Sequence, residues 1–106
     1  NAAAKAEIAI AENNLRIQER NLTQQKADAL SAYYANEQTV RYYEKEGLPN
    51  ATEIAKTAMR LKESGEIDFM NYLRTLNDAF EIQLNYIEAL RNYNSAVIEI
   101  DYLNGN

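Results

Sequence analysis

The sequence of 106 residues contains no cysteine, no histidine and no tryptophan, and it has one proline and three glycines. Without cysteine and histidine, the chain cannot form disulfides, thiolate zinc sites, histidine-based catalytic triads or the histidine-containing di-iron sites of helical bundles. The strong helix breakers are confined to Gly47, Pro49, Gly65 and Gly105. An all-β fold of this size needs more turn residues, so the scarcity of breakers predicts an all-α fold.

Two further absences limit the partners and the setting of the chain. Acidic residues outnumber basic residues by 16 to 11, which disfavours non-specific binding to nucleic acid. No run of about 18 apolar residues is present, so no segment is predicted to cross a membrane as a helix. The sequence has neither an initiator methionine nor a signal peptide, and we therefore expect it to be a piece of a longer protein.

A long, coiled-coil-like helix is predicted over residues 2–46. A mostly apolar row with a period of seven contains Ile8, Leu15, Leu22, Ala29, Asn36 and Tyr43. At 1.5 Å per residue, such a helix is about 65 Å long, which is too long for a compact domain of this size. The row is thin and contains small or polar residues, which favours closely packed helices over a thick core.

Residues 47–50 predict the end of this helix and the start of a second helix over residues 51–63. Gly47 suits the left-handed position that follows a helix C-terminus, and Pro49 cannot continue the hydrogen-bond ladder of the preceding helix. Asn50, with Glu53 three residues later, is typical of an N-cap with its capping-box partner.

A second break is predicted at residues 64–68. Gly65 again suits a C-terminal cap, and Asp68 suits the N-cap of a third helix over residues 69–103, with Ile67 placed to pack across its first turn. The short connection predicts an antiparallel hairpin with its tip at residues 64–68. The third helix has a broad apolar face that can contact two neighbours, and its rows are Leu73, Phe80 and Ile87; Leu76, Leu90 and Val97; and Tyr72, Ala79, Tyr86, Tyr93 and Ile100.

Three groups of side chains could carry chemistry, and each has a simpler interpretation. Glu63, Glu66 and Asp68 are compatible with a metal-binding or docking surface, but a solvated turn with a capping aspartate explains them as well. The eight tyrosines could stack on nucleic acid, but they lie on the apolar rows among charges of both signs, which favours helix packing. Catalytic carboxylate pairs need a cleft, which a thin hairpin lacks, so we expect no enzyme, no metal and no cofactor.

An ordered motif occupies the C-terminal part of the chain. A turn with Gly65, Glu66, Ile67, Phe69 and Leu73 precedes a helix that ends in Tyr93, Asn94, Ala96, Val97, Ile98, Glu99, Tyr102, Leu103 and Gly105. With the upstream segment YYEKEGLPNATEIAKTA (residues 42–58), this order resembles the C-terminal helical hairpin of the TolC-like outer-membrane efflux protein family, most closely its CusC/CzcC-type heavy-metal branch. The resemblance covers roughly residues 40–105, and the first helix shares only the general pattern.

The resemblance implies both a fold and a function. In that family, long helices form a trimeric α-barrel, which is the periplasmic portion of a non-catalytic outer-membrane or cell-envelope channel. The hairpin tip, here Gly65, Glu66, Ile67 and Asp68, meets a periplasmic adaptor that links the channel to an inner-membrane RND pump. Some members are fused behind a pump, and the sequence leaves open whether this chain comes from such a fusion.

The channel entrance is where the sequence departs from the family. Many members carry acidic residues six and nine positions after the tip glycine, and these residues line the closed entrance. Asn71 and Arg74 occupy those positions here. They remain the candidate entrance residues, but the resemblance does not extend to an acidic ring.

A self-standing coiled-coil interaction module is the alternative. In that arrangement, residues 47–49 form a complete turn and the chain folds as a compact three-helix bundle, although the unequal helix lengths disfavour it. In the hairpin, by contrast, the third helix covers the first only back to about residue 25, as counted outward from Gly65. The row Ile8, Leu15 and Leu22 is then bare, and we expect the chain to self-associate through it.

Overall fold

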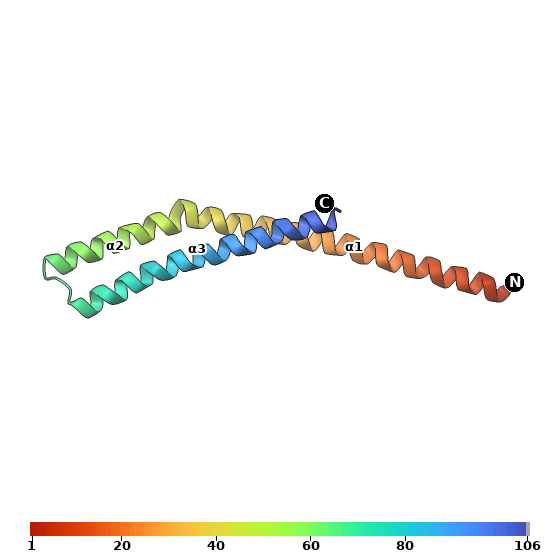
Figure 1. The fold of residues 1–106 in the computed structure, drawn as a ribbon, viewed down its shortest axis with the longest axis horizontal. Coiled ribbons are helices and arrows are strands. Elements are labelled where there is room, and N and C mark those ends of the chain that lie inside the picture. Colours follow the sequence, from red (N-terminus) through yellow and green to blue (C-terminus); the bar gives the residue numbers. More distant parts are fainter. Residues whose placement is uncertain (106) are drawn as a thin grey trace.

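The structure, a computed structural model, describes residues 1–105 as one long helical hairpin (Figure 1). Its elements are α1 (Ala2–Tyr42), a π-helical turn (Tyr43–Gly47), α2 (Leu48–Glu63) and α3 (Phe69–Leu103). The first three form one continuous helical arm that bends at the π-turn, and α3 returns antiparallel along it. The described residues contain no strand, so the predicted all-α hairpin is confirmed.

The molecule measures 91 × 22 × 16 Å along its principal axes. A rod from Ala2 to Glu63 accounts for the long axis, since an α-helix rises about 1.5 Å per residue. These dimensions rule out the compact three-helix bundle. The N-terminal part of α1 projects alone beyond the end of α3 (Figure 1).

The predicted break at residues 47–50 is wrong. Gly47 has a right-handed φ of −61°, and the helix continues through it instead of stopping at residue 46 and restarting at residue 51. Asn50 is an exposed residue inside α2 and caps nothing. The π-turn explains the continuity, because the Leu48 N–H reaches back five residues to the Tyr43 carbonyl. Pro49 follows in the first turn of α2, where its missing N–H is tolerated.

The π-turn also corrects the phase of the packing row. Ala29, Asn36 and Tyr43 are spaced by seven, but the row resumes in α2 at Ala51 and Ala58, after a step of eight. One extra residue in an α-helix rotates all later side chains by about 100°. The wide π-turn takes up that residue, so the buried side chains on both sides of it lie against α3.

Gly47 is required at this turn for space rather than for conformation. A Cβ atom on Gly47 would lie 2.7 Å from Cδ1 of Tyr43. The Tyr43 ring therefore occupies the place of the missing side chain. From there it lies 6.3 Å, between ring centroids, from Tyr86 of α3.

The interface between the two arms of the hairpin is thin and built from small side chains. Its buried apolar residues are Ala29, Val40, Ala51, Ala58, Tyr72, Ala79, Ala89 and Ala96. No large side chain of residues 1–105 is fully buried, and all of residues 1–28 are exposed. A groove at the end of α3 is lined by Lys26, Ala29 and Leu30 of α1 together with residues from the end of α3, and Ala29 is the first buried residue of α1. This confirms that α3 covers α1 only back to about residue 25.

Candidate docking site at the hairpin tip

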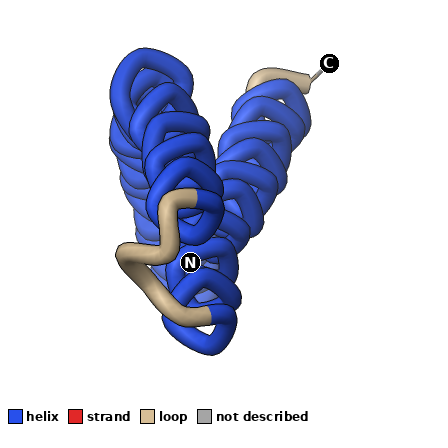
Figure 2. The backbone as a smooth tube through the Cα atoms, turned by 90° about the vertical axis from the view of Figure 1, so that its left-hand side faces the viewer, coloured by secondary structure: helices blue, strands red, loops and turns tan. Residues whose placement is uncertain are grey.

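Gly65 closes the C-terminus of α2 in a Schellman motif. Its φ of +78° is left-handed, a conformation that glycine adopts without steric cost. The Glu66 N–H donates to the Leu61 carbonyl at 2.9 Å, and the Gly65 N–H donates to the Lys62 carbonyl at 3.1 Å. These bonds satisfy two carbonyls that the helix end leaves free. Figure 2 looks along the hairpin from this end and shows the tip loop joining the two helices.

Asp68 begins α3 as its N-cap. Its backbone is extended, and its side-chain Oδ1 accepts a hydrogen bond of 2.7 Å from the Asn71 N–H. Ile67, directly before it, is half-buried in a shallow groove shared with Leu61 and Ala58. Gly65 and Asp68 therefore have the conformations expected of them, and the tip lies where the sequence predicts it.

The remaining polar groups of the tip lie in solvent. Glu63, Glu66, Asp68, Asn71 and Arg74 are all exposed, and neither ion pair found within residues 1–105 involves them. Asn71 and Arg74 are three residues apart on α3, which places them on the same side of the helix. In the part of the chain that the structure describes, no three acidic side chains lie close enough together to hold a metal ion. The tip thus presents separate charges of both signs at the extreme end of a rod.

A second feature is an exposed apolar line along α3, here called the outer stripe. Its members are Phe69, Leu73, Phe80, Leu84, Ile87, Ile98 and Tyr102. Most steps between them are of three, four or seven residues, so they follow one side of the helix. Phe80 is 60% exposed and Leu84 is 62% exposed, although both are large and apolar. The broad apolar face predicted for this helix is therefore divided in two, one part packed against α1 and α2 and the other exposed.

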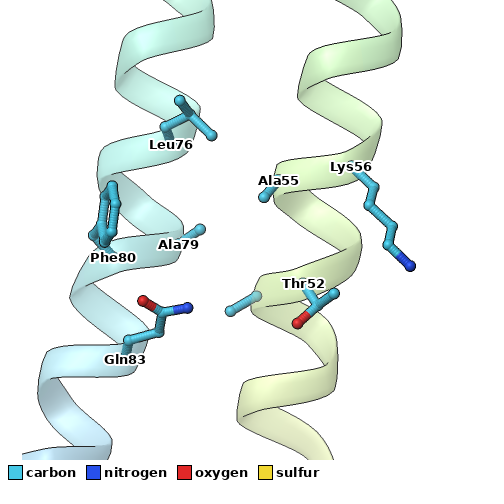
Figure 3. Close-up of a pocket in the computed structure, with 8 residues that line it drawn as sticks. Thr52, Ala55, Lys56, Leu76, Ala79, Phe80 and Gln83 are labelled. Atoms are coloured by element: carbon cyan, nitrogen blue, oxygen red, sulfur yellow. The ribbon is translucent and has the colours of Figure 1, made fainter.

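The outer stripe borders a groove between α2 and α3. The groove has a volume of about 290 Å³, and Figure 3 shows Ala55 and Ala79 pointing toward one another across it. Phe80 and Lys56 lie at its outer edges and point away from this contact. Small side chains thus bring the two helices close together, whereas the large ones are displaced to the margins.

The sequence analysis did not predict two features of the structure, the outer stripe and the π-turn. It placed Leu73, Phe80 and Ile87 in a single row, but it did not connect them with Phe69 and Leu84 as one stripe. It also missed the π-turn, although the step of eight from Tyr43 to Ala51 was a readable signal.

Comparison of the chain with family models, with curated proteins and with solved structures finds no match. Within residues 1–105, no helix combines the length and apolar character that a membrane span requires. The features that bear on function are therefore the motif in the sequence and the geometry of the hairpin.

Proposed function

We propose that this chain is the helical hairpin of a TolC-like channel, the non-catalytic periplasmic part of an outer-membrane or cell-envelope protein. In this proposal, its tip docks a periplasmic adaptor that connects the channel to an inner-membrane RND pump. The resemblance to the CusC/CzcC-type branch makes heavy-metal cations the proposed substrates.

The outer stripe is the observation that carries the proposal. A hairpin that works alone has one apolar interface, between its two arms. This hairpin has a second one along α3, and the described residues leave it uncovered. A helix with apolar residues on two sides suits a wall of parallel hairpins, in which each has a neighbour on either side. A trimeric α-barrel is a closed wall of that kind.

The chemistry of the tip supports docking rather than catalysis. Backbone bonds and the Asp68 cap fix the shape of the turn without using the side chains of Glu66 or Arg74. Exposed charges on a rigid turn can set the register of a partner through complementary charges. Gly65 has no atom within 4 Å of the position its Cβ would take, so a partner backbone can approach it closely.

The entrance proposed for this channel differs from an acidic ring. Asn71 and Arg74 bring one amide and one positive charge per hairpin to the end of α3. In a trimer, three copies of Arg74 would repel cations near the closed end. We therefore propose that adaptor docking opens this end before cations pass.

Replacement of Gly65 by valine tests the docking role in the organism that encodes the protein. A β-branched residue is strained at φ +78° and also blocks close approach. We expect Gly65→Val to abolish tolerance of toxic divalent metals at normal abundance of the protein in the outer membrane. Gly65→Asn, which tolerates the left-handed conformation, separates the two effects because it restores the backbone but keeps a side chain. Normal abundance with unchanged tolerance in Gly65→Val would rule out docking at this residue.

A self-standing coiled-coil interaction module is a second candidate, now in elongated form. The bare row Ile8, Leu15 and Leu22 on the projecting part of α1 favours it, because this row is sufficient to pack against a second helix as a coiled coil. Such a module needs no partner at the tip. Its binding would be lost on Leu15→Glu and unaffected by a change at Gly65.

A further inference from the structure

A pair of tyrosines, one from α1 and one from α3, makes contact between the two arms of the hairpin. The rings of Tyr33 in α1 and Tyr93 in α3 have centroids 5.4 Å apart and are tilted by 36°. Their phenolic oxygens are 3.4 Å apart and form a hydrogen bond. This contact places the two hydroxyl ends side by side across the interface, although the residues are far apart in the sequence.

We propose that Tyr33 and Tyr93 form an oxidative cross-linking site, at which a peroxide-driven one-electron oxidant joins α1 to α3 through a dityrosine bond. The two rings are half-buried, so they are held in place and are still reachable by small oxidants. In dityrosine, the bond joins the two ring carbons that are ortho to the phenolic oxygens, the Cε atoms. The contact between the phenolic oxygens brings this side of both rings together.

The reaction is balanced by the peroxide. Each phenol loses one electron and one proton and becomes a phenoxyl radical. The two radicals form one carbon–carbon bond, and the ring hydrogens at that bond move to the oxygens, which restores both phenols. Hydrogen peroxide takes up the two electrons and two protons and becomes two molecules of water. The product is lighter than the chain by two hydrogen atoms.

Tyr34 gives the site a route to larger oxidants. Tyr34 is 57% exposed, and its ring centroid lies 5.4 Å from that of Tyr33 in an edge-on arrangement. An enzyme too large to reach Tyr33 can therefore oxidise Tyr34, and the radical can pass to the neighbouring phenol.

The hydrogen bond with Tyr93 raises the pKa of Tyr33 to about 12, so Tyr33 is neutral near pH 7 and its proton must leave with the electron.

A second cross-helix tyrosine pair provides an internal comparison. Tyr43 and Tyr86 lie 6.3 Å apart at an interplanar angle of 56°, and the Tyr86 hydroxyl donates to Glu44 at 3.3 Å instead of to a phenol. This pair lacks the contact between hydroxyl groups. Coupling is therefore expected at Tyr33 and Tyr93 in preference to Tyr43 and Tyr86.

The test is to treat the dilute chain with a haem peroxidase and hydrogen peroxide and to map the products by mass spectrometry. The expected product is a monomer that has lost two hydrogens, in which tryptic peptides 27–41 and 92–106 are joined. Fragmentation should place the bond at Tyr33 and Tyr93. Tyr93→Phe, which keeps the ring, should abolish this product, whereas Tyr86→Phe should leave its yield unchanged.

Circular dichroism of both variants establishes that they keep the helical hairpin. An unchanged yield of the intramolecular product in a folded Tyr93→Phe chain would overturn the proposal. So would a bond that maps mainly to Tyr43 and Tyr86, or products that are exclusively intermolecular.

Discussion

Gly65 lies at φ +78° in open space, so its role in folding is one of backbone conformation alone. We predict that Gly65→Ala lowers the free energy of unfolding by about 1–2 kcal/mol, the usual cost of a left-handed residue with a Cβ atom. Gly65→Asn should lose less, because asparagine tolerates this region. Urea unfolding followed by circular dichroism measures both. Equal losses for alanine and asparagine would show that strain at this φ is not the cause.

The effect of replacing Gly47, in contrast to Gly65, should depend on a neighbouring side chain. In the wild-type chain, we predict that Gly47→Ala is destabilising by about 1–3 kcal/mol, because its Cβ meets the Tyr43 ring at 2.7 Å. In a Tyr43→Ala background the clash is gone, and alanine should stabilise the helix by about 1 kcal/mol relative to glycine. A double-mutant cycle from thermal unfolding measures this change of sign. The same sign in both backgrounds would contradict the close contact.

At the level of the helices, the π-turn determines which side of α2 packs against α3. It accommodates one residue more than the packing row allows, and Pro49 follows it in the first turn of α2. Deletion of one residue from this turn should therefore restore a regular spacing of seven from Ala29 to Ala58. A regular α-helix would then place Pro49 in its interior, which costs about 3 kcal/mol, so the deletion must be combined with Pro49→Ala.

We predict that deletion of Glu46 together with Pro49→Ala leaves the hairpin folded and cooperative. The matched control is deletion of Lys56 together with Pro49→Ala, which removes an exposed residue from α2, where no π-turn can compensate. The control should turn the packing row of the remaining α2 away from α3 and lower the melting temperature. Thermal unfolding by circular dichroism compares the two. Equal melting temperatures would show that the π-turn does not act as a phase correction.

The elements differ in how far the sequence predicts them. The tip was predictable because both caps depend on local hydrogen bonds around Gly65 and Asp68. The continuous helix through residues 47–50 was harder to predict, since glycine and proline there are compatible with either a break or a continuous helix, and only the step of eight from Tyr43 to Ala51 indicated the π-turn. Packing against α3 decided between the two, because the buried Ala51 and the Tyr43 ring, 6.3 Å from the Tyr86 ring, both lie against α3 in the continuous helix. Local signals thus identify ends that are local, and tertiary packing overrides them elsewhere.

The outer stripe was only partly predictable, for a related reason. Apolar periodicity gives the residues of a helix face but not which part of a broad face is covered. Tyr72 and Ala79 are buried in the hairpin, whereas Leu73 and Phe80, each the next residue along, are exposed. The division between them depends on where α2 lies, and that becomes visible only in the structure.

For the molecule as a whole, the uncovered apolar rows predict self-association of the chain. Ile8, Leu15 and Leu22 continue the row that packs on α3, yet all three are exposed. We expect sedimentation velocity to detect oligomers at high concentration, and we expect Leu15→Glu to weaken them. Asn13→Glu adds the same charge away from the row and should have little effect. A strict monomer at all concentrations would contradict this prediction.

The proposed docking of an adaptor at the tip can be tested with Glu66→Arg. Glu66 is exposed, and its part in the turn is made by its backbone, so charge reversal should leave folding intact. Glu81→Arg makes the same change on an exposed position of α3 away from the tip. The measurement is growth on graded toxic divalent metal, at matched abundance of each variant in the outer membrane. We predict that Glu66→Arg loses tolerance and that Glu81→Arg does not, whereas full tolerance in Glu66→Arg would contradict docking at the tip.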